Sequence, residues 1–274
     1  MNVPSDARGT SSTELRLISP LRRLVGAERS EAADAQLGFT LCFIAGAVNA
    51  GGFLAVGQYT SHMSGIVSAM ADNIALGAVG LAVAGLGALM SFVLGAACSA
   101  VLINWGRRHV AYRQYSFPLL LEAALLLAFG LIGSMRAYMP ILVVAAVPLL
   151  CFIMGLQNAI ITKVSHARIR TTHVTGIATD IGIELGKLFY WNRTGGLLGG
   201  RVLADRRKLR LLASLLGAFL LGGVVGALGF KHIGFVSAIP LALLLFLLAG
   251  VPMLVDFLAW CRAAFRRRNS RDTR

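Results

Sequence analysis

Long apolar stretches alternate with short polar connections along most of this chain. A helix of about 20 apolar residues crosses a hydrocarbon core of about 30 Å. The stretches lack the strict alternation of a membrane β-barrel strand, so helices are the structure that satisfies their backbone inside lipid. The pattern therefore predicts an all-α, polytopic membrane protein. Its six predicted spans are 36–57, 79–104, 117–136, 139–161, 209–230 and 233–260.

Two further segments, 62–77 and 173–187, are shorter and more polar than a span, and each follows one. They are predicted to be half-length helices. Gly51, Gly52 and Gly57 precede the first of them. Glycine tolerates backbone conformations that end a helix, so these positions favour an interruption there. Irregular backbone at membrane depth must be covered by protein or line a cavity.

The sequence repeats itself. Residues 41–50 read LCFIAGAVNA and residues 150–159 read LCFIMGLQNA, and SHMSGI at 61–66 is echoed by THVTGI at 172–177. These ordered matches predict a duplication, with one repeat at 36–137 and the other at 139–261. Each repeat would hold three full crossings, which is an odd number. The second repeat is therefore predicted to lie upside down relative to the first, as in many secondary transporters.

The distribution of charge agrees with this topology. The chain carries a net charge of +14, with 26 Lys and Arg residues. With six spans and a cytoplasmic N-terminus, all of these except Arg136 and Lys231 fall on one side, which is the positive-inside pattern. Residues 1–35 and 262–274 are then basic cytoplasmic tails that can contact anionic lipids. No basic face is interleaved with aromatic residues on a soluble domain, so a nucleic-acid partner is not expected.

Composition narrows the class further. The chain is 57% hydrophobic and only 14% charged, and its mean hydropathy is +0.74. Residues 1–35 lack the apolar region of a cleavable signal peptide. The sequence has none of the familiar catalytic or phosphate-binding motifs, so we expect no enzyme, cofactor or metal site. Four cysteines lie in or at the ends of apolar stretches without metal-ligand spacing, and we interpret them as packing residues: Cys42, Cys98, Cys151 and Cys261.

Polar residues at equivalent places in the two repeats are candidates for a solute site. Asn49 and Asn158 lie inside apolar spans, where an amide either bonds to another helix or contacts a solute. His62 and His173 open the half-length helices, where a histidine can contact a solute or cap the helix. Ser61 and Thr172 are predicted as the N-caps. The full candidate set is Asn49, Ser61, His62, Ser64, Gly65, Asn158, Thr172, His173, Thr175 and Gly176.

Acidic and amide residues supply candidates for ion coupling or cavity lining. Glu122 lies near the start of the third predicted span, where an acid can carry a proton or pair with Arg107, Arg108 or Arg113. The acids of the second half-length helix can line a cavity or form a structural ion-pair cluster with Lys187. The candidates are Asp72, Asn73, Glu122, Asp180 and Glu184.

Two segments resemble a known family. They are Gly46-x-x-Asn49-Ala50 followed by Ser61-His62-Met63-Ser64-Gly65, and Gly155-Leu156-Gln157-Asn158-Ala159 followed by Thr172-His173-Val174-Thr175-Gly176. In these, the chain resembles the YoaK family of bacterial multipass membrane proteins over about residues 36–261. The resemblance implies an inner-membrane protein and a candidate small-molecule transporter. Family members tend to have Asp at the position of Asn49.

Together these patterns favour a carrier that binds a small solute between the two repeats and exposes it alternately to the two sides of the membrane. Three other classes fit the sequence. They are a channel, a membrane enzyme that acts on lipid-soluble substrates, and a membrane scaffold that acts through its basic tails.

Overall fold

The computed structural model describes residues 31–109, 114–134, 141–164, 172–190, 202–250 and 253–254. Its regular structure within these residues is entirely helical, as the sequence predicts. The helices are α2 (Glu31–Val56), α3 (Met63–Ala75), α4 (Val79–His109), α5 (Ser116–Ser134), α6 (Ile141–Val164), α7 (Val174–Phe189), α8 (Arg206–His232) and the short η1 (Gly234–Ser237), after which the chain stays helical to residue 250.

Four of these helices are long and apolar enough to cross a membrane: α2, α4, α6 and α8. The stretches 116–131 and 234–250 form shorter apolar helices at the positions of the third and sixth predicted spans. Helix α2 begins at Glu31, so the predicted N-terminal tail is helical over its last five residues. The rest of that tail and the whole tail at 262–274 lie outside the described residues.

The end of α2 differs from the sequence prediction. The helix runs through Gly51 and Gly52 without interruption and ends before Gly57, whose φ is +76°. Gly51 is needed for packing instead, because a Cβ there would collide with the ring of Phe230. The half-length helices begin and end close to their predicted limits of 62–77 and 173–187.

At two helix crossings, α2 with α8 and α6 with α4, glycines allow the two backbones to come into direct contact. Where α2 crosses α8, a Cβ at Gly46 would collide with the carbonyl oxygen of Phe219, and a Cβ at Gly222 with that of Phe43. Small residues at membrane helix interfaces allow such close approach.

The crossing of α6 with α4 is built in the same way. A Cβ at Gly155 would collide with the carbonyl oxygen of Phe92, and a Cβ at Gly95 with that of Phe152. Gly46 and Phe43 occupy the same places in their sequence repeat as Gly155 and Phe152. The two similar segments therefore make the same kind of crossing, each time with a helix from the other half of the chain.

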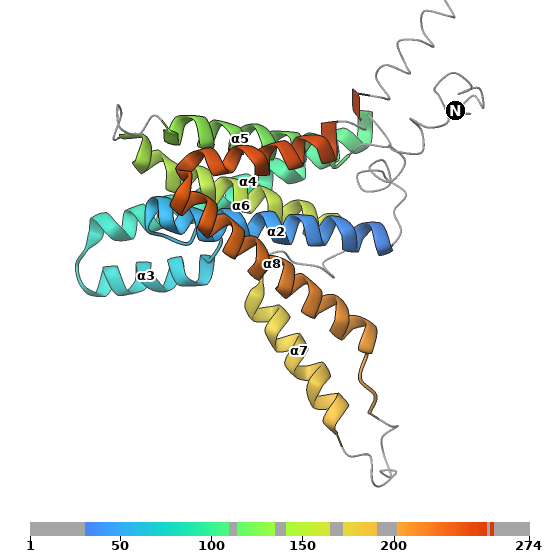
Figure 1. Cartoon of the computed structure of the whole chain (residues 1–274). Helices are drawn as coiled ribbons and strands as arrows, with labels where there is room; N and C mark the ends of the chain where they lie inside the picture. Colours follow the sequence, from blue (N-terminus) through green and yellow to red (C-terminus); the bar gives the residue numbers. More distant parts are fainter. Residues whose placement is uncertain are drawn as a thin grey trace, which may run out of the picture.

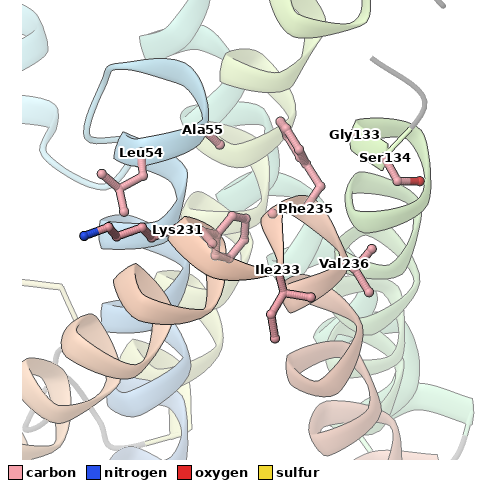
Figure 2. A pocket seen from close by; sticks show the side chains of 10 residues that line it. Leu54, Ala55, Gly133, Ser134, Lys231, Ile233, Phe235 and Val236 are labelled. Atoms are coloured by element: carbon pink, nitrogen blue, oxygen red, sulfur yellow. The ribbon is translucent and has the colours of Figure 1, made fainter. Parts of the chain in front are cut away.

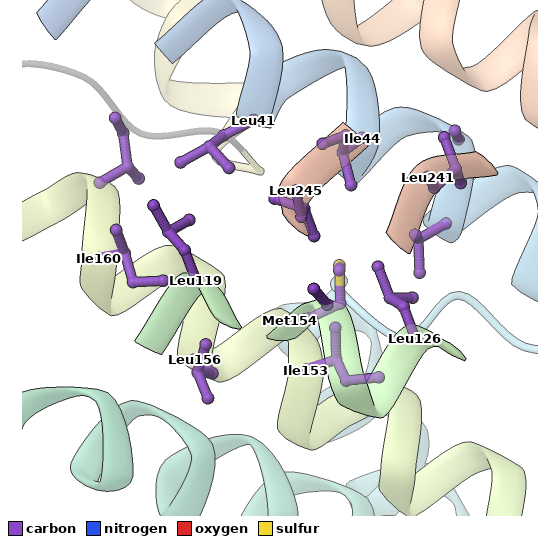
Figure 3. Close-up of a cluster of buried hydrophobic side chains, with 14 of the residues drawn as sticks. Leu41, Ile44, Leu119, Leu126, Ile153, Met154, Leu156, Ile160, Leu241 and Leu245 are labelled. Atoms are coloured by element: carbon purple, nitrogen blue, oxygen red, sulfur yellow. The ribbon is translucent and has the colours of Figure 1, made fainter. Parts of the chain in front are cut away.

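The hydrophobic core lies where α2, α5, α6 and the helix at 238–250 meet (Figure 3). Leu and Ile side chains from all four elements interdigitate there, and Met154 fills the space between them. Fully buried members include Leu41, Ile44, Leu119, Leu126, Leu150, Ile153, Leu156, Ile160 and Leu245.

The two half-length helices are placed differently in Figure 1. Helix α3 lies against the bundle, beside α4, and Met70 of α3 contacts the α4 backbone at Gly85. Helix α7 and the N-terminal part of α8 extend together away from the bundle. Gly182 and Gly186 of α7 have no other group of the described chain within reach of a Cβ.

Candidate solute-binding site

Asn49 anchors the connection between α2 and α3. Its side-chain oxygen accepts hydrogen bonds from the backbone N–H of Ser61, at 3.2 Å, and from the hydroxyl of Ser61, at 2.9 Å. The amide therefore joins the last turns of α2 to the residue just before the start of α3. This arrangement satisfies a polar group that would be costly to expose to lipid.

Asn158 makes the equivalent contact in the second half. Its oxygen accepts a hydrogen bond from the hydroxyl of Thr172 at 2.8 Å, and its nitrogen donates to the carbonyl of Met154 at 3.0 Å. The repeated amides thus hold the starts of the two half-length helices by the same bond. Each amide is paired within its own half of the chain.

The N-cap residues of α3 and α7 are histidines. The sequence-based prediction of Ser61 and Thr172 as the N-caps is therefore wrong. His62 caps α3 and His173 caps α7, each with a non-helical backbone and without a side-chain bond to the helix. The hydroxyls of Ser61 and Thr172 are unavailable as caps because they are directed to the asparagines.

The two histidines differ in where their rings lie. The ring of His62 lies directly over Gly65, so that a Cβ at residue 65 would collide with it. His173 approaches Gly176 only with its own Cβ, at 4.0 Å from the position of a Cβ there. Both side chains are exposed at the surface of the chain.

A cavity of about 750 Å³ opens beside His62, between α3, α4 and the N-terminal part of α6. Its polar groups are the amides of Gln58 and Asn73, the imidazole of His62 and the hydroxyl of Tyr59. Tyr59 stacks on Phe53, with ring centroids 4.5 Å apart. Among the described residues, no Asp, Glu, Lys or Arg lines the cavity. The arrangement suits an uncharged guest that presents hydrogen-bonding groups and a flat apolar face.

Of the predicted site residues, only His62, Gly65 and Asn73 line this cavity. Sequence reasoning missed Gln58, Tyr59 and Phe53. The sequence offered one indication of them, since Gln58 and Tyr59 are a polar and an aromatic residue in the short connection after the first apolar span. Four other predicted residues of the half-length helices are exposed outside it: Ser64, Asp72, Thr175 and Gly176.

The acids of α7 form an ion-pair cluster with the start of α8. Glu184, whose side chain is 2% exposed, lies 2.9 Å from the ammonium of Lys187 and accepts a 2.8 Å hydrogen bond from the backbone N–H of Asp205. Asp180 pairs with Lys208 at 3.5 Å. Both acids therefore form ion pairs, as the structural alternative for these residues predicted. The hydrogen bond from Lys187, then that from Asp205, lowers the pKa of Glu184 below its usual value.

Asp205 completes this cluster as the N-cap of α8. Its carboxylate accepts hydrogen bonds from the backbone N–H groups of Arg207, at 2.9 Å, and Lys208, at 3.0 Å. These bonds, with that from Lys208 the larger influence, lower the pKa of Asp205. We call Glu184, Lys187, Asp205 and Lys208 the α7–α8 clasp.

Glu122 lies elsewhere, fully buried on α5 beside Gln157 of α6. Of the two alternatives for Glu122, the pairing with Arg107 or Arg108 is not formed, because both arginines are exposed and neither carboxyl oxygen has a hydrogen-bond partner within the described chain. Arg113, the third arginine considered, lies outside the described residues.

A second cavity, of about 470 Å³, lies between the ends of α2 and α5 and the turn after α8. Figure 2 shows Phe235, Val236 and Ile233 forming its wall, with the Lys231 ammonium directed away from them. The polar side chains that line it are those of Ser134 and Lys231. Its described lining therefore includes a charged group, unlike that of the cavity beside His62. Across the described residues, no group of three His, Cys, Asp or Glu side chains is placed to hold a metal ion.

Comparison with known proteins identifies relatives. The family described as "Protein of unknown function (DUF1275)" matches residues 37–251. The "UPF0700 transmembrane protein YoaK" of Bacillus subtilis (strain 168) is 26% identical over 209 residues, which are 74% of this chain and 88% of that protein. No solved structure matches. These findings confirm the resemblance expected from the paired motifs.

Proposed function

The chain belongs to the DUF1275 family of membrane proteins, and we propose that this member is a carrier for a small uncharged solute. The observation that carries the proposal is the cavity beside His62. It combines two amides, an imidazole and a stacked aromatic pair, and none of its described lining residues is charged. Such a mixture of a few polar groups and apolar surface is typical of small-molecule sites.

We further propose six spans arranged as two inverted repeats, α2 to α5 and α6 to the helix that includes residues 238–250. The two glycine crossings support this arrangement, since each first helix of a repeat contacts the third helix of the other repeat through equivalent residues. In this topology both termini and the α7–α8 clasp lie on the cytoplasmic side of the inner membrane, where the basic segments contact anionic lipids.

In that topology the cavity beside His62 opens toward the non-cytoplasmic side. The unequal placement of α3 and α7 supports a carrier in one of two alternating states, because inverted repeats exchange conformations when the carrier turns over. Rocking of α3 against α4 and α6 would close the cavity from one side. The solute-contacting residues are His62, Asn73, Gln58 and Tyr59. Asn49 and Asn158 hold the moving elements in place.

A thermal-shift screen of the purified protein against uncharged metabolites tests the site. A ligand at 100 times its dissociation constant stabilises the folded state by about 2.7 kcal/mol, so a screen of many compounds can reveal which solute binds. The stabilisation should be lost in His62→Ala and in Asn73→Ala. His173→Ala is the matched control, because it changes the equivalent residue of the other repeat, and it should keep the shift.

Two outcomes would contradict the proposal. If His173→Ala abolished the shift as strongly as His62→Ala, the site would not be the cavity beside α3. If the ligand bound but reconstituted vesicles showed no counterflow of that ligand, the protein would bind the solute without carrying it.

A further inference from the structure

Two polar side chains lie next to each other in the apolar core, away from the cavity beside His62. Glu122 of α5 and Gln157 of α6 are both fully buried. Both carboxyl oxygens of Glu122 and the side-chain oxygen of Gln157 lack a hydrogen-bond partner among the described residues. The side chain of Gln157 is nevertheless close enough to Glu122 to interact with it. Buried polar groups without partners are rare in native structures, so this pair calls for an explanation.

Within the part of the chain that the structure describes, no positive charge compensates a carboxylate at this place. None of the ion pairs among the described residues includes Glu122. An isolated ion in such a core costs several kcal/mol. Arg107, Arg108, His109 and Lys163 are exposed near the C-terminal ends of their helices. The helices around Glu122 also carry Glu31, Asp34 and Cys42 on α2, Cys98 on α4 and Cys151 on α6, and Tyr115 lies just before α5.

A proton on Glu122 removes the uncompensated charge and supplies the donor that the oxygen of Gln157 lacks. An ionised carboxylate only accepts hydrogen bonds, whereas a carboxylic acid has one O–H to donate. The oxygen of Gln157 is an acceptor that lacks a donor. Protonated Glu122 is the neighbouring group that can supply this donor.

Gln157 also connects the acid to the frame of the protein. Its nitrogen donates to the carbonyl oxygen of Leu41 on α2 at 3.3 Å. It directly precedes Asn158, which holds Thr172 at the start of α7. A change in the Glu122–Gln157 contact therefore affects α2, α5 and α6. It also affects the hydrogen bond from Thr172 to Asn158 at the start of α7.

We propose that Glu122 is a proton-binding site that loads and unloads during the conformational cycle. The carboxylic acid releases its proton to water when the core opens on one side, and the carboxylate takes a proton from water when it opens on the other. The core closes only around the neutral acid. This inference rests on the proposed carrier function, and it makes the proton the coupling ion.

Infrared spectroscopy of the purified protein in lipid tests the site with the proton as the only probe. At neutral pH the wild type should show the carbonyl stretching band of a protonated carboxylic acid. Glu122→Gln should remove this band. Glu184→Gln is the matched control and should keep it, because Glu184 is ionised in the α7–α8 clasp. Persistence of the whole band in Glu122→Gln would overturn the proposal.

Transfer into D₂O distinguishes a working proton site from an acid that is merely enclosed. The band of Glu122 should shift as its proton exchanges for a deuteron in the folded protein. A band that never shifts would overturn the proposal. If Glu122→Gln does not fold, Gln157→Leu replaces it, and the loss of the acceptor should move the band to higher frequency. These readouts need no solute, so they stand or fall separately from the thermal-shift screen.

Discussion

The two half-length helices begin in the same way and then differ. In both, an asparagine of the preceding helix holds a hydroxyl, Ser61 or Thr172, and a histidine follows as the N-cap. Beyond that point, α3 lies against the bundle and helps to form an uncharged cavity, whereas α7 is tied to α8 by ion pairs. The shared residues hold the helices in place, and two of them, His62 and Gly65, also line the cavity. The other polar groups of the cavity and the residues of the clasp are not repeated.

This comparison changes what the repeat indicates about function. The sequence directs attention to the residues that occur twice, because duplication makes them conspicuous. In the structure the duplicated amides are engaged by their own half of the chain. The cavity contains Gln58, Tyr59 and Asn73, which the second half does not match. A repeated polar residue in such a protein can serve the scaffold, and the difference between the halves is then the better indicator of a site.

Substitutions at the two equivalent helix crossings, α2 with α8 and α6 with α4, should lower the stability of the protein more than any other change considered. Gly46→Ala and Gly155→Ala each drive a methyl group into a backbone carbonyl that cannot move aside. Overpacking costs about 1–3 kcal/mol where side chains can adjust, and here we expect that amount or more. Thermal unfolding of the purified variants measures it.

Gly87→Ala on α4 and Gly217→Ala on α8 are the controls, because a Cβ at either position meets open space. They should be neutral, or stabilising by up to about 1 kcal/mol through helix propensity. Because the two crossings are equivalent, Gly46→Ala and Gly155→Ala should lower the stability of the protein by similar amounts. A large effect in one half alone would show that the crossings differ.

The two asparagines offer a sharper contrast of intermediate size. Asn49 uses only its oxygen in the contacts with Ser61, so Asn49→Asp retains both acceptors and should be tolerated. Asn158 also donates to the carbonyl of Met154. Asn158→Asp removes that donor and leaves two acceptors facing each other, with an expected cost of about 1–3 kcal/mol.

Thermal unfolding in detergent again provides the measurement for this pair. Alanine at the two positions serves as the reference, since both alanine variants lose the bond to the hydroxyl. A side-chain hydrogen bond in a membrane protein contributes about 0.6 kcal/mol on average. The interpretation would fail if Asn49→Asp were more damaging than Asn158→Asp.

The smallest expected effect is a change in the pH dependence of the melting temperature, which we expect for a variant in α7 and not for one in α3. The pKa values of Glu184 and Asp205 are lowered in the folded protein, so their stabilising contribution is fully present above the ordinary carboxyl range. It is lost as the pH falls through that range toward the lowered values. The melting temperature of Glu184→Gln should therefore lie below that of the wild type at neutral pH, and the gap should close in acid.

Asp72→Asn on the exposed face of α3 is the matched control for the clasp, and its melting temperature should follow that of the wild type at every pH. Added salt should also narrow the gap between Glu184→Gln and the wild type, because Lys187 and Lys208 are partly exposed and their pairing is screened. If the difference in melting temperature between Glu184→Gln and the wild type did not depend on pH, Glu184 would stabilise the protein by packing and not by its charge.

The sequence by itself determined the properties that depend on neighbouring residues. Hydropathy over windows of about 20 residues sets which segments enter the membrane, so the helical class and the limits of α3 and α7 were predictable. The spacing of Glu184 and Lys187, one helical turn apart, was sufficient to predict their ion pair. The paired motifs were sufficient to indicate the family.

Only the tertiary structure decided which distant groups meet. Asn49 could face a solute, another helix or Ser61, and the path of the connecting backbone selected Ser61. Asp205 reaches Glu184 because α7 and α8 lie side by side, and no local sequence pattern predicts that contact. The cavity beside His62 exists because α3 lies against α4 and α6, whereas the same motif opens α7 away from the bundle. Local periodicity sets the elements, but polar pairing depends on separations of a few ångströms, and these arise only when the helices pack.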